Sequence, residues 1–130
     1  MKTKGFTLVE LLAVIAILGI IALIVSPTLI GVVNKSKKDI KEEQIAALEN
    51  AASRWTLSNE ECLYNHVGAF NLSFDALKQS GLITTKEVID PTTNNELVGC
   101  IAITWSDTVN QYLTEYTESC TTINTCETGI

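Results

Sequence analysis

The sequence predicts an α+β fold in which a long N-terminal helix, membrane-spanning in its first half, packs against a small antiparallel β-sheet head. Three observations support this prediction. Residues 11–34 carry no charge, and residues 35–57 continue with apolar side chains at helical spacing. Residues 97–105 and 111–117 then read as two strands separated by a short polar turn.

With about 30 of the 130 residues in the apolar segment, the remainder can form one small soluble domain. We expect a leader peptide at residues 1–5 and a helix at residues 6–57. Its membrane and assembly segment is residues 6–34, and its amphipathic half is residues 35–57. Residues 58–130 form a small α+β extracytoplasmic head.

The first half of the helix has the length of a membrane span. From Leu11 to Asn34 there are 24 residues without a charge, which gives roughly 36 Å of helix and covers a hydrocarbon core. Glu10 lies at the start of this segment. A carboxylate in an apolar span costs on the order of 2 to 3 kcal/mol near the membrane centre, so a partner is expected.

That partner has to be a cation. Lys2 and Lys4 are the only basic side chains among the first 34 residues. A cut after Gly5 would create another cation, a free ammonium on Phe6. The Phe6 amine of a neighbouring subunit, displaced by about one helical turn, could then neutralise Glu10 and set the register of an assembly.

Small residues recur every three positions in the apolar helix, at Ala13, Ala16, Gly19 and Ala22. Such a ridge lets helices approach closely, although alanine and glycine are also common in membrane spans generally. Glycine loosens a helix, and proline removes one of its hydrogen bonds. We therefore expect any extension or melting to begin between Gly19 and Pro27.

The helix is expected to continue into an amphipathic half. The charged residues between 35 and 43 are interpreted as a solvated face, with a bridge between subunits as the alternative. The apolar positions that follow helical spacing are Val33, Ile40, Ala47, Leu48, Ala51 and Trp55.

In the head, residues 62–72 show no clear period and are predicted to be a connecting loop. A short helix follows, with Ser73 as its N-cap and a stop at Gly81. Residues 90–95 have the composition of a turn. The two strands come next, and the residues expected to share their apolar face are Ile101, Ile103, Trp105 and Leu113.

The charge is unevenly distributed. Residues 1–50 carry six lysines and five acids, whereas residues 51–130 carry three basic and ten acidic residues. An acidic head repels phosphate groups, so we expect it to have no direct contact with nucleic acid.

All four cysteines lie in the predicted head, where disulfides would stabilise a small core. Three pairings are possible, and the arrangement we favour joins Cys62 to Cys100 and Cys120 to Cys126. A zinc site from these cysteines and His66 has loose spacing, and a Cys62–His66 catalytic pair lacks an orienting third residue. We expect no catalytic residue, no metal and no cofactor, and His66 is interpreted as a loop residue.

Residues 4–12, Lys-Gly-Phe-Thr-Leu-Val-Glu-Leu-Leu, resemble the class III signal and N-terminal helix of type IV pilins and pseudopilins. The resemblance extends to about residue 55. It implies cleavage after Gly5 by a membrane prepilin peptidase, N-methylation of Phe6, and helical polymerisation. The five-residue leader and small head look more like Gram-positive examples. The matching positions are Gly5, Phe6, Thr7, Glu10, Gly19 and Pro27.

Two other interpretations of the N-terminus fit less well. A secretory signal should end in small residues spaced A-x-A, and none occurs; the nearest exit, residues 25–27, places proline after the cut. A plain single-span anchor leaves Glu10 without a partner. Lysines flank both ends of the span, so charge alone does not orient it. The cysteines and the short leader place the head outside the cytoplasm.

These features predict a non-enzymatic structural subunit of a type IV pilus or pilus-like filament. Its partners would be a prepilin peptidase, other copies of itself or sister pilins, and the membrane before assembly. It would begin as a single-pass membrane protein and end in an extracellular filament on the cell surface. The alternatives are a pseudopilin of a DNA-uptake or secretion system, and an unprocessed membrane-anchored binding domain.

Overall fold

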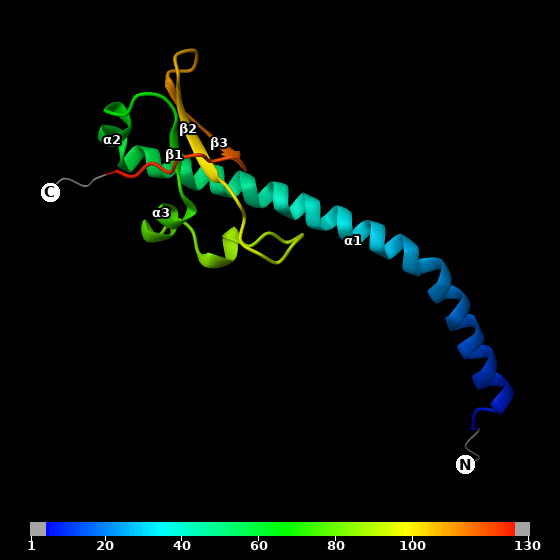
Figure 1. Ribbon diagram of the computed structural model, residues 1–130. Coiled ribbons are helices and arrows are strands. Elements are labelled where there is room, and N and C mark those ends of the chain that lie inside the picture. Colours follow the sequence, from blue (N-terminus) through cyan, green and yellow to red (C-terminus); the bar gives the residue numbers. More distant parts are fainter. Residues whose placement is uncertain (1–4, 127–130) are drawn as a thin grey trace. The chain divides into compact units, whose positions relative to one another are not determined.

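The computed structural model describes residues 5–126. It contains two compact units, divided between Lys37 and Lys38, and the α+β class is confirmed (Figure 1). The first unit holds the N-terminal part of helix α1, which runs from Leu8 to Ser58. The second holds the rest of α1 and a small head.

Within residues 5–37, no other segment covers the first part of α1. Every residue from 5 to 40 is exposed, and the most apolar 18-residue window of α1 has a mean hydropathy of 3.1. Among the described residues, α1 alone is long and apolar enough to cross a membrane. Such a surface is not stable in water, so it requires lipid or other helices.

The head contains a three-stranded antiparallel sheet in the order β1-β2-β3. The strands are β1 (Phe70–Leu72), β2 (Cys100–Ser106) and β3 (Gln111–Thr117). Strand β1 lies in the segment that we predicted to be a loop, so that prediction is wrong there. Three residues are too few to show a period, and β1 exists because Phe70 pairs with Ile103 in β2.

The second part of α1 packs against this sheet (Figure 1). Leu48, Ala51 and Trp55 are buried as expected, whereas Ala47 is exposed and Ala52 is buried in its place. Val33 and Ile40, also predicted to lie on the apolar face, are exposed. The core therefore begins only near residue 48. The largest fully buried side chains in the second unit are Leu48, Phe70, Leu72, Leu77, Val88, Cys100, Ile101 and Ile103.

Strand register corrects the predicted apolar face of the hairpin. Leu113 pairs with Thr104, so it lies on the face opposite to Ile101 and Ile103, and its side chain is exposed. Tyr112 pairs with Trp105 on the inner face instead. Alternation within β3 suits either orientation, and only the pairing with β2 decides between them.

Both edges of the sheet are covered. At β3, the Tyr116 backbone N–H donates to the Glu49 carboxylate of α1 at 2.9 Å. At β1, the Asn71 backbone N–H donates to the Asn124 side chain, and the Asn124 N–H donates to the Asn71 carbonyl, both at 2.9 Å. These contacts satisfy backbone groups that would otherwise attract another strand.

Three short helical elements complete the head. Helix α2 (Glu60–Tyr64) follows α1, and the 3-10 helix η1 (Thr85–Val88) precedes the turn. Helix α3 (Phe74–Gln79) begins after Ser73, whose hydroxyl accepts a hydrogen bond from the Ala76 N–H at 3.2 Å. The predicted N-cap of this helix is therefore confirmed.

Candidate processing and assembly site

The predicted cleavage bond lies in an open, non-helical segment just before α1. Gly5 and Phe6 are both exposed, and the Phe6 side chain is 86% accessible. A Cβ atom added at Gly5 would meet nothing within 4 Å. The fold therefore leaves this bond accessible and does not itself require glycine there. Lys2 and Lys4 of the predicted leader lie outside the described residues.

Thr7 and Glu10 cap the start of α1 reciprocally. The Thr7 hydroxyl accepts from the Glu10 N–H at 3.2 Å, and the Glu10 Oε2 accepts from the Thr7 N–H at 3.1 Å. This capping box satisfies two backbone donors that a helix start leaves unpaired, and a carboxylate there also interacts favourably with the helix dipole. The sequence analysis missed this role, although the Thr-x-x-Glu spacing was sufficient to find it.

Glu10 therefore has partners inside a single chain, but these partners are neutral. Within residues 5–126, Glu10 forms no ion pair, and its Oε1 accepts no hydrogen bond. A carboxylate oxygen can accept more than one hydrogen bond. The capped conformation thus leaves one face of Glu10 available to a cation from elsewhere.

The small-residue ridge is uncovered in the single chain. Ala13, Ala16, Gly19 and Ala22 are all exposed, and a Cβ at Gly19 would meet nothing within 4 Å. Gly19 is therefore not required by any contact inside the chain. A close approach by another helix would supply such a requirement.

The helix is continuous through Pro27. Proline cannot donate the usual backbone hydrogen bond four residues back. At the residue directly before Pro27, the Ser26 hydroxyl donates to the Ala22 carbonyl at 2.7 Å, a contact that helices tolerate and that often bends them. Melting between Gly19 and Pro27 is absent from this single chain and stays a prediction for an assembled form.

These features at residues 5–10 can be compared with known families. Residues 1–26 match a family model described as the prokaryotic N-terminal methylation motif. The chain has a prepilin-type N-terminus. The resemblance to pilins and pseudopilins is thereby confirmed.

The relatives share one name, type II secretion system core protein G. Type II secretion system core protein G of Escherichia coli (strain K12) is 43% identical over 58 residues, which are 45% of this chain and 40% of that protein. The proteins of the same name from Aeromonas hydrophila and Vibrio cholerae are each 47% identical over 60 residues, covering 45% of this chain and 41% and 40% of theirs. The matched segment thus spans about two fifths of these relatives.

These relatives are named as core proteins of a secretion system and not for a catalytic activity, in agreement with the prediction that the prepilin-like chain is not an enzyme. No solved structure matches the chain significantly.

The disulfide pairing differs from the one we favoured. Cys62 bonds to Cys126, and Cys100 bonds to Cys120. The first bond ties the C-terminal segment, which covers the β1 edge, to α2; the second closes the β2–β3 hairpin. With both thiols of Cys62 and Cys126 oxidised, neither the zinc nor the thiol-enzyme alternative is available. Within residues 5–126, no group of three His, Cys, Asp or Glu side chains could hold a metal ion.

A salt bridge holds the turn of the head against α1. The Lys41 ammonium lies 2.9 Å from the Asp90 carboxylate, which is nearly buried. The hydrogen bond from the Thr92 hydroxyl, together with that from Lys41, lowers the pKa of Asp90 to about 2 despite its burial. Gln44 also donates to the Ile89 carbonyl at 2.8 Å. The turn residues therefore serve the fold rather than a ligand.

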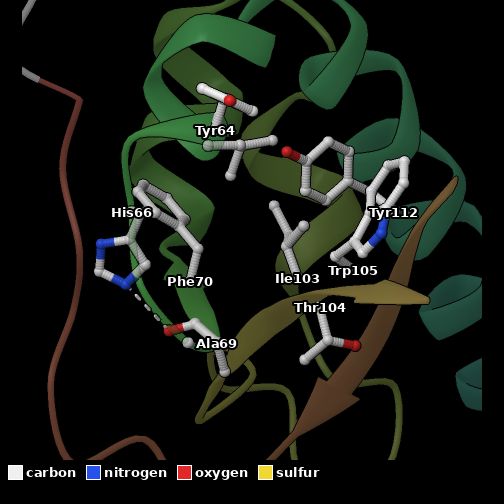
Figure 2. Close-up of a pocket in the computed structure, with 10 residues that line it drawn as sticks. Tyr64, His66, Ala69, Phe70, Ile103, Thr104, Trp105 and Tyr112 are labelled. Atoms are coloured by element: carbon white, nitrogen blue, oxygen red, sulfur yellow. Dashed lines mark hydrogen bonds between the residues drawn. The ribbon is translucent and has the colours of Figure 1, made fainter. Parts of the chain in front are cut away.

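The head also has a cleft that the sequence analysis did not anticipate (Figure 2). It has a volume of about 650 Å³ and lies between the end of α2 and the hairpin end of the sheet. Figure 2 shows Tyr64, His66 and Phe70 on one wall and Trp105 and Tyr112 on the other. The His66 Nε2 lies 3.2 Å from the Ala69 carbonyl oxygen.

Proposed function

We propose that this chain is a structural subunit of a type IV pilus or pilus-like filament, and that it polymerises through its N-terminal helix after cleavage between Gly5 and Phe6. One observation carries the proposal. An exposed bond inside a prepilin-type motif directly precedes a capped apolar helix whose first part has every side chain exposed. A helix of this kind needs lipid before cleavage and other helices after it.

The chemistry of assembly would follow from the cut. Cleavage makes Phe6 the first residue, with an ammonium group that is then N-methylated. Because Glu10 Oε2 holds the Thr7 N–H of its own chain, Oε1 is free to accept the Phe6 ammonium of a neighbour. Pairing the two charges in an apolar layer offsets part of the cost of burying each, and it fixes the axial register.

The division of the chain serves this cycle. Residues 1–5 are the leader, residues 6–57 the assembly helix with its span at 6–34, and residues 58–130 the exported head. The subunit would wait as a single-pass membrane protein and then enter an extracellular filament with copies of itself or sister pilins. A prepilin peptidase would process it.

The names of the relatives bear on the type of filament that we propose. They support a pseudopilin of a secretion system as the second candidate. The matched residues amount to 45% of the chain, however, and most of the head lies outside such a length. A pseudopilin of a DNA-uptake system is a third candidate, for which the acidic head offers no direct nucleic-acid surface.

Intact-mass analysis of the membrane and sheared-filament fractions tests the proposal. We expect a mature chain that begins at Phe6 with one added methyl group. Gly5→Val should accumulate as uncut precursor in the membrane, because the added side chain meets nothing in the fold and so acts only on the peptidase. The head of this variant should keep both disulfides. A wild-type chain that retains residues 1–5 beside an active prepilin peptidase would contradict the proposal.

A further inference from the structure

The aromatic cleft of the head has the composition of a site for a cation. The aromatic side chains that line it are Tyr64, His66, Phe70, Trp105 and Tyr112. Tyr64 is 85% exposed, and Trp105 is half-exposed. In a cleft of ligand size, exposed aromatic rings such as those of Tyr64 and Trp105 attract an ammonium or guanidinium group through their negative quadrupole.

Hydrogen bonding favours a cation over a neutral apolar group. The Trp105 indole N–H donates to the Asp107 carboxylate at 2.9 Å, so the polar edge of the ring is already paired. A carboxylate at that edge increases the electron density on the ring face. Trp105 and Tyr112 are also held edge to face, with ring centroids 4.9 Å apart and an interplanar angle of 72°.

The surroundings of the cleft are mainly acidic. Trp105 and Tyr112 also line a second hollow of about 360 Å³, on whose wall lie Glu60 and the basic residue Arg54. Near Trp105 and Tyr112 there are thus two carboxylates, those of Glu60 and Asp107, and one guanidinium, that of Arg54. Residues 51–130, which include these three groups, carry ten acids and three basic residues, so their field attracts positive segments.

The chain itself contains a matching positive segment. Lys35, Lys37 and Lys38 are exposed, and within residues 5–126 none of them forms an ion pair. The first residue of α1 on the wall of the second hollow is Ser53, 15 residues after Lys38. That spacing is roughly 22 Å along α1, so the Lys38 side chain cannot reach the hollow beside Trp105 and Tyr112 in its own chain.

We infer that the aromatic cleft formed by Tyr64, Trp105 and Tyr112 receives a lysine of residues 35–38 from a second copy of this chain. The lysines lie on α1, whereas the cleft lies between α2 and the sheet, so the two surfaces differ and the contact is heterologous. Such a contact can repeat along an open filament, and it allows one copy to engage two neighbours. The inference rests on the proposed filament function and adds to it a second contact, outside the apolar helix.

Photo-crosslinking in cells that assemble the filament tests this contact. A benzoylphenylalanine in place of the exposed Tyr64 should give a crosslinked dimer whose second peptide contains residues 35–41. Replacing Lys35, Lys37 and Lys38 together by glutamine should reduce that dimer by about tenfold, whereas the same three changes to arginine should preserve it. Trp105→Ala should reduce it similarly with both disulfides retained.

The outcomes separate this inference from the proposed function. Crosslinks to another part of the chain or to a different protein, in cells that do form filaments, would overturn the lysine contact alone. Equal dimer yields from the glutamine and arginine variants would do the same. Absence of any multimer from wild-type cells, by crosslinking and by electron microscopy of sheared material, would overturn both proposals.

Discussion

The two parts of α1 differ completely in what surrounds them. Residues 8–37 are all exposed, although Glu10 is the only charged residue between 8 and 34. In contrast, residues 38–58 bury Leu48, Ala51 and Trp55 against a sheet. Both parts are helical to the same extent. Helix formation therefore does not depend on burial here. Burial instead distinguishes what the two parts pack against.

The difference teaches where the first part finds its stability. Residues of the same chain cover an apolar stripe of the second part. Each large side chain buried there stabilises the fold by about 1.5 to 3 kcal/mol. The first part has apolar side chains around its whole circumference, and this is typical of a helix that is covered on every side. Since its own chain does not cover it, lipid or other subunits have to do so.

The largest effect should come from removing the charge of Glu10. Glu10→Gln keeps the capping box, because glutamine serves in that motif as well as glutamate does, and it removes the anion that would pair with Phe6 of a neighbour. We expect normal insertion, processing and head folding, with nearly complete loss of sheared filaments. The filament yield from cells measures the effect.

Thr7→Val provides the control for the capping box. It removes the hydroxyl acceptor and should cost about 1 kcal/mol of helix stability, yet it keeps the charge of Glu10 and should still assemble. Near-normal filaments with Glu10→Gln would mean that the ridge at Ala13, Ala16, Gly19 and Ala22 sets the register instead.

The second prediction concerns the disulfides, which lie only in the head. The Cys62–Cys126 bond closes a separation of 64 residues and the Cys100–Cys120 bond one of 20. In chain-entropy models, the first bond stabilises the head by about 4 kcal/mol and the second by about 3 kcal/mol. The double serine variant of the first pair should therefore destabilise the head more, as urea unfolding in detergent, followed by Trp fluorescence, would show.

The helical signal of residues 8–37 should survive in both serine variants, because no disulfide contacts that part of the chain. Equal losses in the two variants would show that residual structure in the unfolded chain outweighs loop length. Loss of the N-terminal helix together with the head would contradict the separation of the two units.

The smallest effect should come from the salt bridge between Lys41 and Asp90. The folded pKa of Asp90, about 2, is below its ordinary value of 3.8. The charged form therefore stabilises the fold above about pH 4, and this contribution should be lost as the pH falls toward 2. Asp90→Asn should cost about 1 to 3 kcal/mol at pH 7, and its difference from wild type should shrink below pH 4.

Lys41→Met serves as the matched control. It removes one partner of Asp90 but keeps the hydrogen bonds from Thr92, so it should destabilise the head less than Asp90→Asn does. Urea unfolding between pH 2 and pH 7 measures all three proteins. If the free energies of unfolding of wild type and Asp90→Asn differ by the same amount at every pH in this range, the charge of Asp90 does not contribute to the stability of the head.

Local patterns in the sequence predicted much of the fold. The uncharged run and the helical spacing predicted a long helix, and the cap at Ser73 and the strand at residues 111–117 are where the pattern indicated. The capping box at Thr7 and Glu10 was equally local. A charge in an apolar segment indicates a distant cation, whereas the capping partner of Glu10 lies only three residues earlier.

The remaining features depend on contacts far apart in the chain. Strand β1 exists through its pairing with β2, about 30 residues later, and the cleft combines residues of α2 with the β2–β3 hairpin. None of these contacts leaves a period or a spacing in the sequence, because each depends on how the elements pack together.

The sequence by itself determined the prepilin-type N-terminus and the apolar helix, because both follow from residue types within a few turns of one another. Tertiary structure alone decided the disulfide pairing, the inward face of β3 and the aromatic cleft. A disulfide requires its two Cα atoms to lie about 6 Å apart, and Cys62 meets Cys126 at 5.7 Å only after 64 residues of intervening chain have folded.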